Sequence, residues 1–313
     1  MTLSKLNVAL CFLGLFGLFS SCTKEDDSNL KGAVQFEITD APIDDARVKS
    51  AVVTISEVRI DGTKVDGFNK TTVDLLAYQN GNTKLLFDSE MEAKSYNNVT
   101  LVLDFETDAN GNAPGCYVEE QGNGVKHKLE SSTNEITLNQ AFTVTSSGAR
   151  SVIDFDLRKC IREELNGSDD FDFVSETELK SGIRIVNKNQ AGVIMGKCTD
   201  TFSSSDKLIV YAYKKGEYNR NTEIQGQGES QLEFANAVSS AAVDANGNYS
   251  LHFLEPGDYE LHFCSYEENN EGKMELKGTL LLDVLTAIDL GAINVDASAS
   301  VTVDVLVTGL LPL

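Results

Sequence analysis

The stretch "AVQFEITDAPIDD", residues 33–45, decides the fold class. Its apolar residues Val34, Phe36 and Ile38 alternate with polar ones, and this period of two predicts a strand with one buried face. The strand should end at Pro42, which cannot donate a ladder hydrogen bond, and the aspartates around it favour a turn.

The same alternation recurs along the first half of the chain. In "VTISEVRIDG", residues 53–62, the apolar phase shifts near Ser56 and Glu57, which predicts a β-bulge. Turns such as "QNGNT" and "DANGNAPG" supply the Asn-Gly pairs that tolerate positive φ, and no long amphipathic helix is evident. Many short strands predict an all-β antiparallel sandwich or partial barrel; the further candidates are "TVDLL" 72–76, "NVTLVLDF" 98–105, "EITL" 135–138, "FTVT" 142–145, "VIDFDL" 152–157 and "GIRIVN" 182–187.

A second domain opens at "AGVIMGKCTD", residues 191–200, after the polar linker "NKNQ". In "AAVDANGNYSLHFLEPGDYELHF", residues 241–263, "DANGN" predicts a tight turn and "EPGD" a reversal of the chain. The two flanking strands should each turn an apolar face to the core, formed by Tyr249, Leu251, Phe253, Tyr259, Leu261 and Phe263.

Both halves carry family resemblances. The ordered motifs from "FEITDAPIDD" to "SGIRIVN" resemble an uncharacterised domain-of-unknown-function family of bacterial surface lipoproteins, over about residues 32–188. The second half resembles the non-catalytic carboxypeptidase regulatory-like domain, a small prealbumin-like β-sandwich whose first strand Ile194, Gly196 and Cys198 would occupy. Its polar middle, "GEYNRNTEIQGQGESQ" at 216–231, departs from that family and is expected to be a long loop.

The N-terminus indicates export and lipidation. Lys5 precedes an apolar run from Leu6 to Phe19, too short to span a bilayer and of the length of a secretory signal. "FSSC" resembles a bacterial lipobox with Phe19 in place of the usual Leu, so Cys22 would carry the lipid that anchors the protein. The following "TKEDD" resembles the Lys-acid-acid signal that sends lipoproteins of Bacteroidota-type bacteria to the cell surface. An ordinary signal peptide and a merely solvated tether are the alternatives.

Charge and cysteine content narrow the class further. The formal net charge of -22 argues against a nucleic-acid partner, because the sequence has no continuous basic stretch that could follow phosphates. The mature chain keeps four cysteines, and an even number in an exported protein suggests disulfides. Pairing within each domain is preferred, Cys116 with Cys160 and Cys198 with Cys264, with buried thiols as the alternative.

Few residues suggest chemistry. Histidine is the usual catalytic base, but His127 has no companion motif, and His252 and His262 are at most half of a weak metal site across two neighbouring strands. A calcium site is the one cofactor considered. It would use Asp169, Asp170 and Asp172 of "GSDDFDF", with Asp40, Asp44 and Asp45 nearby, although no full calcium-loop signature is present.

These observations predict a non-enzymatic outer-membrane lipoprotein, anchored to the membrane by lipid and binding an unidentified ligand or protein at the cell surface. The expected divisions are a signal peptide at 1–21, an acidic tether at 22–31, and β-sandwich domains at 32–188 and 189–313. The alternative is a pilus subunit that donates its C-terminal strand, "SVTVDVLVTGLLPL", to a neighbour.

Overall fold

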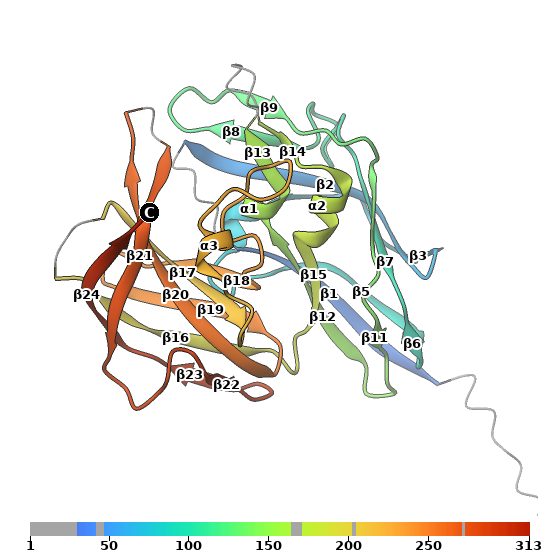
Figure 1. Cartoon of the computed structure of the whole chain (residues 1–313). Coiled ribbons are helices and arrows are strands. Elements are labelled where there is room, and N and C mark those ends of the chain that lie inside the picture. The colour runs from blue at the N-terminus through green and yellow to red at the C-terminus, as the bar shows by residue number, and fades with distance from the viewer. Residues whose placement is uncertain (1–29, 42–46, 164–170, 202–204, 271–272) are drawn as a thin grey trace, which may run out of the picture.

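The protein is built almost entirely of strands (Figure 1), as predicted. The structure is a computed structural model that describes residues 30–41, 47–163, 171–201, 205–270 and 273–313. The predicted signal peptide, Cys22 and most of the tether lie outside these residues. Every ladder joins strands of residues 31–187 to one another or strands of residues 192–312 to one another.

The first region contains a four-stranded sheet in the order β15-β12-β1-β5 and a seven-stranded sheet in the order β10-β7-β2-β8-β9, with β3 and β4 attached to β2. Two small ladders, β11-β6 and β13-β14, complete it. The strands are β1 (Lys31–Ala41), β2 (Val48–Ile60), β3 (Thr63–Lys64), β4 (Thr71–Asp74), β5 (Lys84–Glu92), β6 (Ser95–Tyr96), β7 (Val99–Leu103), β8 (Tyr117–Glu120), β9 (Lys126–Lys128), β10 (Glu135–Leu138), β11 (Phe142–Thr143), β12 (Ala149–Asp156), β13 (Ile161–Glu163), β14 (Phe171–Phe173) and β15 (Ile183–Asn187).

β1 forms as its alternation predicted. Val34, Phe36 and Ile38 are fully buried in the core between the two large sheets. β1 pairs parallel with β12 and antiparallel with β5, a mixture that alternation alone does not reveal. The predicted bulge in β2 is confirmed, because its register with β7 shifts between Ile55 and Glu57.

The second region is one curled nine-stranded sheet in the order β18-β17-β20-β21-β24-β16-β19, with β22 on β20 and β23 on β16. Its core includes Tyr249, Leu251, Tyr259, Leu261 and Phe263, as predicted. Its strands are β16 (Gly192–Thr199), β17 (Lys207–Lys214), β18 (Ser239–Ala242), β19 (Asn248–Leu254), β20 (Gly257–Glu268), β21 (Met274–Val284), β22 (Ile293–Val295), β23 (Ser300–Thr302) and β24 (Val305–Pro312).

One sequence-based expectation fails here. β19 and β20 are consecutive but do not pair, since β19 joins β16 while β20 lies between β17 and β21. The segment "EPGD" therefore carries the chain from one side of the curled sheet to the other. Phe253 leaves the predicted alternation, because it adopts a φ of 54° and is only partly buried.

The helices are short: α1 (Leu157–Cys160), α2 (Glu176–Ser181), α3 (Arg220–Glu223) and the 3-10 helix Leu75–Tyr78. Ser175 caps α2 by accepting from the backbone N–H of Glu178, and its hydroxyl donates to the Glu178 carboxylate at 3.0 Å. No helix among the described residues is long and apolar enough to cross a membrane.

The C-terminal strand belongs to its own sheet. β24 pairs with β21 from Val305 to Pro312 and briefly with β16, and Val303, Val305 and Val307 are buried in the second core. β24 is therefore a paired strand of its own sheet, whereas the pilus alternative expected this strand to be donated to a neighbour.

The predicted disulfides do not form. All four cysteines are buried and none is in a disulfide bond. Cys198 belongs to the main core of the second region, whereas Cys264 packs in a separate cluster with Tyr211 and Phe234. Cys116 is held elsewhere, where its sulfur accepts from the N–H of Thr54 at 3.3 Å.

Candidate functional site

The two regions meet where β1 ends. The turn after the 3-10 helix carries Asn80 and Gly81, both with positive φ as the Asn-Gly pair predicted. Gly81 lies against His252 of β19, so close that a Cβ at this position would be 2.6 Å from the imidazole ring. Only glycine fits both this backbone conformation and this contact. Burial lowers the pKa of His252, so the ring packs here as a neutral group.

A groove of about 760 Å³ opens beside this contact. Met195 of β16 lines it, between its register partners Ser250 of β19 and Thr302 of β23. Gln79 and Asn80 of the first region form part of its wall. Most of the groove is therefore formed by the second region, with one wall supplied by the first, and its volume is typical of small-ligand sites.

A small polar cavity of about 20 Å³ adjoins the groove and shares Asn80, Ser250 and His252 with it. Asp40 lines this cavity and is 5% exposed. Its carboxylate accepts from Gln79 Nε2 at 2.9 Å and from the N–H of Leu157 at 3.1 Å. Burial nevertheless raises the pKa of Asp40 well above its usual value, because taking a carboxylate out of water disfavours its charged form.

Two cations of α1 fasten the regions together. Arg158 Nη1 donates to the carbonyl oxygens of Glu233 at 2.7 Å and Phe234 at 3.3 Å, and its guanidinium lies 5.2 Å from the ring centroid of Tyr211. Lys159 Nζ donates to the carbonyl of Ala237 at 2.5 Å. Burial lowers the pKa of Lys159 to about 8. These contacts use backbone acceptors, so the loop of the second region must hold one conformation to receive them.

The loop that receives these contacts includes the polar segment expected to depart from the second family. It is ordered around Glu223 of α3, which is 1% exposed. The Glu223 carboxylate accepts from Tyr213 at 2.8 Å and from Asn236 Nδ2 at 2.6 Å. On the other side, Ser230 donates to Glu178 of α2. The long loop is thus ordered and holds the two regions together through these contacts. The sequence alone did not reveal this role.

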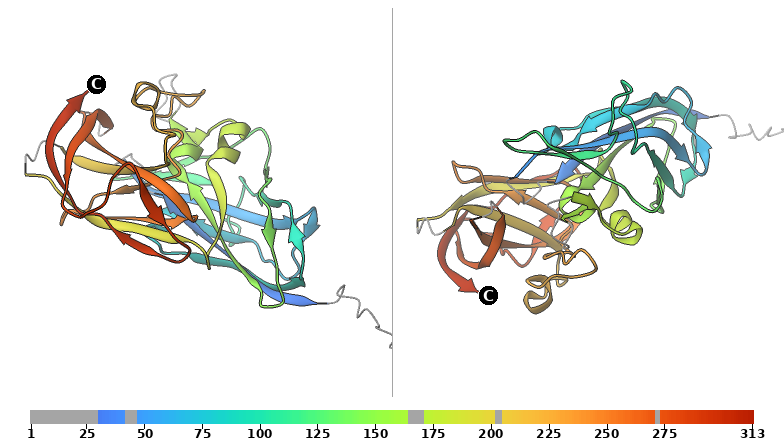
Figure 2. Two further views of the ribbon diagram at one scale, coloured as in Figure 1. Left: turned by 60° about the horizontal axis from the view of Figure 1, so that its bottom comes forward. Right: turned by 90° about the horizontal axis from the view of Figure 1, so that it is seen from above.

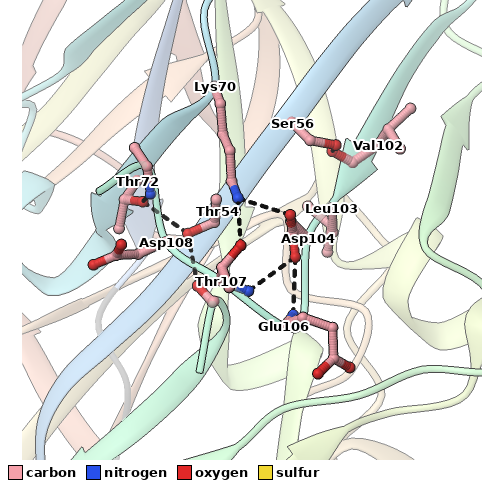
Figure 3. A network of polar contacts seen from close by, with 12 residues as sticks. Thr54, Ser56, Lys70, Thr72, Val102, Leu103, Asp104, Glu106, Thr107 and Asp108 are labelled. Carbon is pink, nitrogen blue, oxygen red and sulfur yellow. Dashed lines mark hydrogen bonds and ion pairs between the residues drawn. The ribbon is translucent and has the colours of Figure 1, made fainter. Parts of the chain in front are cut away.

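A second polar network, away from this junction, has a structural role. Figure 3 shows Lys70 Nζ reaching Asp104 at 2.7 Å and Thr107 at 2.8 Å. Burial opposes ionisation of Asp104, but hydrogen bonds from Lys70 and from the N–H groups of Thr107 and Glu106 outweigh it and lower its pKa. The network fixes the loop that follows β7. The thiol of Cys116 borders it, because its sulfur accepts from the N–H of Thr54 at 3.3 Å and donates to the carbonyl of Asp104 at 3.5 Å, and burial raises the pKa of this thiol to about 12.

The three histidines lie apart. His262 stacks on Tyr218 with ring centroids 3.5 Å apart and contacts Tyr213, whereas His252 lines the groove. His127 contacts Glu120 at 3.3 Å and the edge of Phe171. The suggested pairing of His252 and His262 is therefore wrong, because their strands are not neighbours.

The calcium prediction remains a prediction, since Asp169, Asp170, Asp44 and Asp45 lie outside the described residues. Asp172 accepts backbone N–H groups from Glu130 and Phe173. No group of three or more His, Cys, Asp or Glu side chains that could hold a metal occurs in the described ranges.

The repeated "DANGN" segments are turns in both regions. In each, the aspartate, Asp108 or Asp244, accepts from the N–H groups two and four residues later, and the final asparagine's amide donates to the same carboxylate. These bonds lower the pKa of both carboxyls, and they account for the aspartate at the start and the asparagine at the end of each turn.

Comparison with known families identifies the first region. Residues 31–174 match the family described as "Domain of unknown function (DUF4382)". This confirms an uncharacterised-domain family for that part of the chain. The resemblance of the second region to carboxypeptidase regulatory-like domains remains a prediction. The chain matches no curated protein.

Solved structures offer slight likenesses. The Bacillus anthracis TIE protein matches at 10% identity and a TM-score of 0.20, over 90% of this chain and 34% of that one, so the chain spans about a third of its length. The minor pilin of Streptococcus agalactiae matches at 14% and 0.21, over 88% and 96%. The major pilin subunit of Bacillus cereus matches at 10% and 0.21, over 89% and 71%. Scores this low support no inference about function.

Proposed function

We propose that this chain is a lipid-anchored, non-enzymatic protein of the outer cell surface that presents the groove at the junction of its two regions to a ligand. The observation that supports this proposal is the direction of β1. β1 begins at Lys31, next to the tether that would follow a lipidated Cys22, and ends at the junction. Its eleven residues span roughly 35 Å. Figures 1 and 2 show the start of β1 at the end of the molecule remote from the second region.

The chemistry of the groove suits binding better than catalysis. Its polar groups are amides, hydroxyls, two carboxylates, the lysine ammonium of Lys197 and the neutral ring of His252. Asp304 accepts from the backbone N–H of Lys197 at 2.8 Å, and Asp244 is engaged in its turn. No cysteine lines the groove, and burial raises the pKa of Cys116 and Cys198 to about 12, so neither is an activated thiol.

Cell fractionation and ligand arrays test this proposal together. Wild-type protein should be in the outer membrane and be digested by protease added to whole cells, and Cys22→Ala should release it. Soluble chain from Thr23 onward should retain ligands from a glycan and peptide array that a Met195→Arg, Ser250→Arg variant with an unchanged melting temperature does not retain. Protection of the wild type in intact cells, or binding that the groove substitutions leave intact, would contradict the proposal.

A further inference from the structure

The four-stranded sheet has two edge strands, and they differ in how their outer backbone groups are satisfied. At β15, the side-chain amide of Gln140 takes the place of a neighbouring strand. Its Oε1 accepts from the N–H of Ile185 at 2.6 Å and its Nε2 donates to the carbonyl of Ile183 at 3.4 Å. This edge is closed to another chain.

The other edge, β5, is nine residues long and pairs only with β1 among the described strands. The N–H of Ala93 donates to the carbonyl of Leu30 at 2.8 Å, which fixes the alternation of the antiparallel ladder. Asp88, Glu90 and Glu92 are therefore the residues that point their N–H and C=O groups away from β1. Glu92 agrees with this, because its carbonyl accepts from the hydroxyl of Tyr96 at 3.0 Å. No described residue bonds the outward backbone groups of Asp88 or Glu90.

Space for another strand lies beside this edge. A groove of about 400 Å³ separates β5 from the hairpin of β2 and β3, which belongs to the opposite sheet. Met91, Ile60, Val65 and Tyr96 contribute apolar surface to it. Its charged lining combines three lysines with four acids: Lys31, Lys64, Lys94, Asp61, Asp66, Glu90 and Glu92. Side chains that alternate along an added strand would enter this groove, and those between them would face solvent.

The charge on the edge restricts the partner. Asp88 and Glu90 face solvent, and the Asp88 carboxylate accepts from the neutral side-chain amide of Gln35 at 2.8 Å. Glu90 makes no ion pair with a described residue. Two copies of β5 side by side would bring these acids together, and like charges directly opposite one another destabilise a sheet. Lysine or arginine opposite them would instead be attracted.

We propose that the outer edge of β5 is a docking site for an extended segment of a partner protein, with Lys or Arg opposite Asp88 and Glu90 and apolar residues at the alternating positions. The segment adds a fifth strand to the sheet, and its backbone bonds the outward groups of Asp88 and Glu90. This site lies at the anchored end of β1 and is independent of the groove at the junction.

Amide exchange measured by NMR on the soluble chain tests the proposal. The probe is a nine-residue acetylated peptide in which lysine alternates with valine or threonine, and the control peptide has glutamate in place of lysine. The amides of Asp88 and Glu90 should exchange rapidly in the free protein and be protected when the lysine peptide is added. The glutamate peptide should bind at least about tenfold more weakly, which corresponds to about 1.4 kcal/mol.

Two substitutions at Glu90 distinguish the contribution of its backbone N–H from that of its side-chain charge. Glu90→Ala keeps the N–H, and the lysine peptide should still protect Asp88. Glu90→Pro removes that N–H, which β1 does not use, so slow exchange of Ser89 and Met91 should persist while peptide binding is lost. Absence of binding, binding that survives Glu90→Pro, equal affinity for both peptides, or dimers of the chain joined through β5 would each overturn the proposal.

Discussion

Removing the guanidinium of Arg158 should weaken the contact between the two regions, so that they unfold independently. The side chain is 5% exposed, donates to two carbonyls of the second region and lies 3.4 Å from Asp156, whose side chain is 10% exposed. Arg158→Ala leaves these acceptors and a buried carboxylate without their main donor. Breaking a buried charged pair in this way costs about 3 to 5 kcal/mol. For a chain of this size the loss corresponds to a fall in melting temperature of roughly 6 to 10 °C.

Calorimetry with a matched control checks this. Arg150→Ala also removes an arginine paired with a carboxylate, Glu37, at 3.2 Å, but the Arg150 side chain is 48% exposed. The control should lose only about 0 to 1 kcal/mol. Wild type should unfold in one transition, and Arg158→Ala in two, because the second region would no longer gain stability from the first. A loss as small as that of the control, with one transition retained, would refute the reasoning.

Three further outcomes are expected. The folded-state pKa of Asp40 lies above its unfolded value near 3.8, so the stability that Asp40 contributes is complete below that pH and is lost as the pH rises towards the folded-state pKa. Urea titrations from pH 4 to 8 should therefore show the free energy of unfolding falling less steeply in Asp40→Asn than in wild type. The exposed control Asp66→Asn should not change the slope. At pH 8 a thiol reagent should label Cys116 and Cys198 only after unfolding, because burial raises both pKa values to about 12, and rapid labelling of native protein would contradict this. Deleting residues after Ser300 removes β24 from between β21 and β16, so circular dichroism should show the second region unfolded, whereas a folded truncation would contradict the observed pairing.

Local pattern was sufficient for most of the first region. The alternation in β1, the end of that strand at Ala41 before Pro42 and the bulge in β2 were all predictable, because each depends on residues within a few positions of one another. The same holds for the buried faces of β19 and β20. What alternation could not specify is which strand lies next to which, and this is why His252 and His262 were wrongly placed together.

The contacts at the junction of the two regions could not be predicted from local pattern either, and for a related reason. Arg158 and Phe234 are 76 positions apart, and their contact joins a guanidinium to a backbone carbonyl, which leaves no trace in the identity of the second residue. The disulfide prediction failed similarly. It rested on the even number of cysteines, but all four are buried free thiols that serve as small apolar side chains of the cores. Cys198 and Cys264 pack in different clusters, and Cys116 and Cys160, although in one core, contact different segments, Thr54 and Leu179.

β5 was not among the predicted strands, and the reason bears on its proposed role. Its sequence "KLLFDSEME" lacks the β-branched residues that mark a strand, and its solvent face is acidic. Charged side chains on an edge are a common protection against unwanted pairing. The unpaired acids here, Asp88 and Glu90, repel the same acids of another copy yet attract a basic segment. Under the proposed surface anchoring, which would hold the chain at high local concentration, this selectivity would suppress self-association while the edge stays open to a partner of opposite charge.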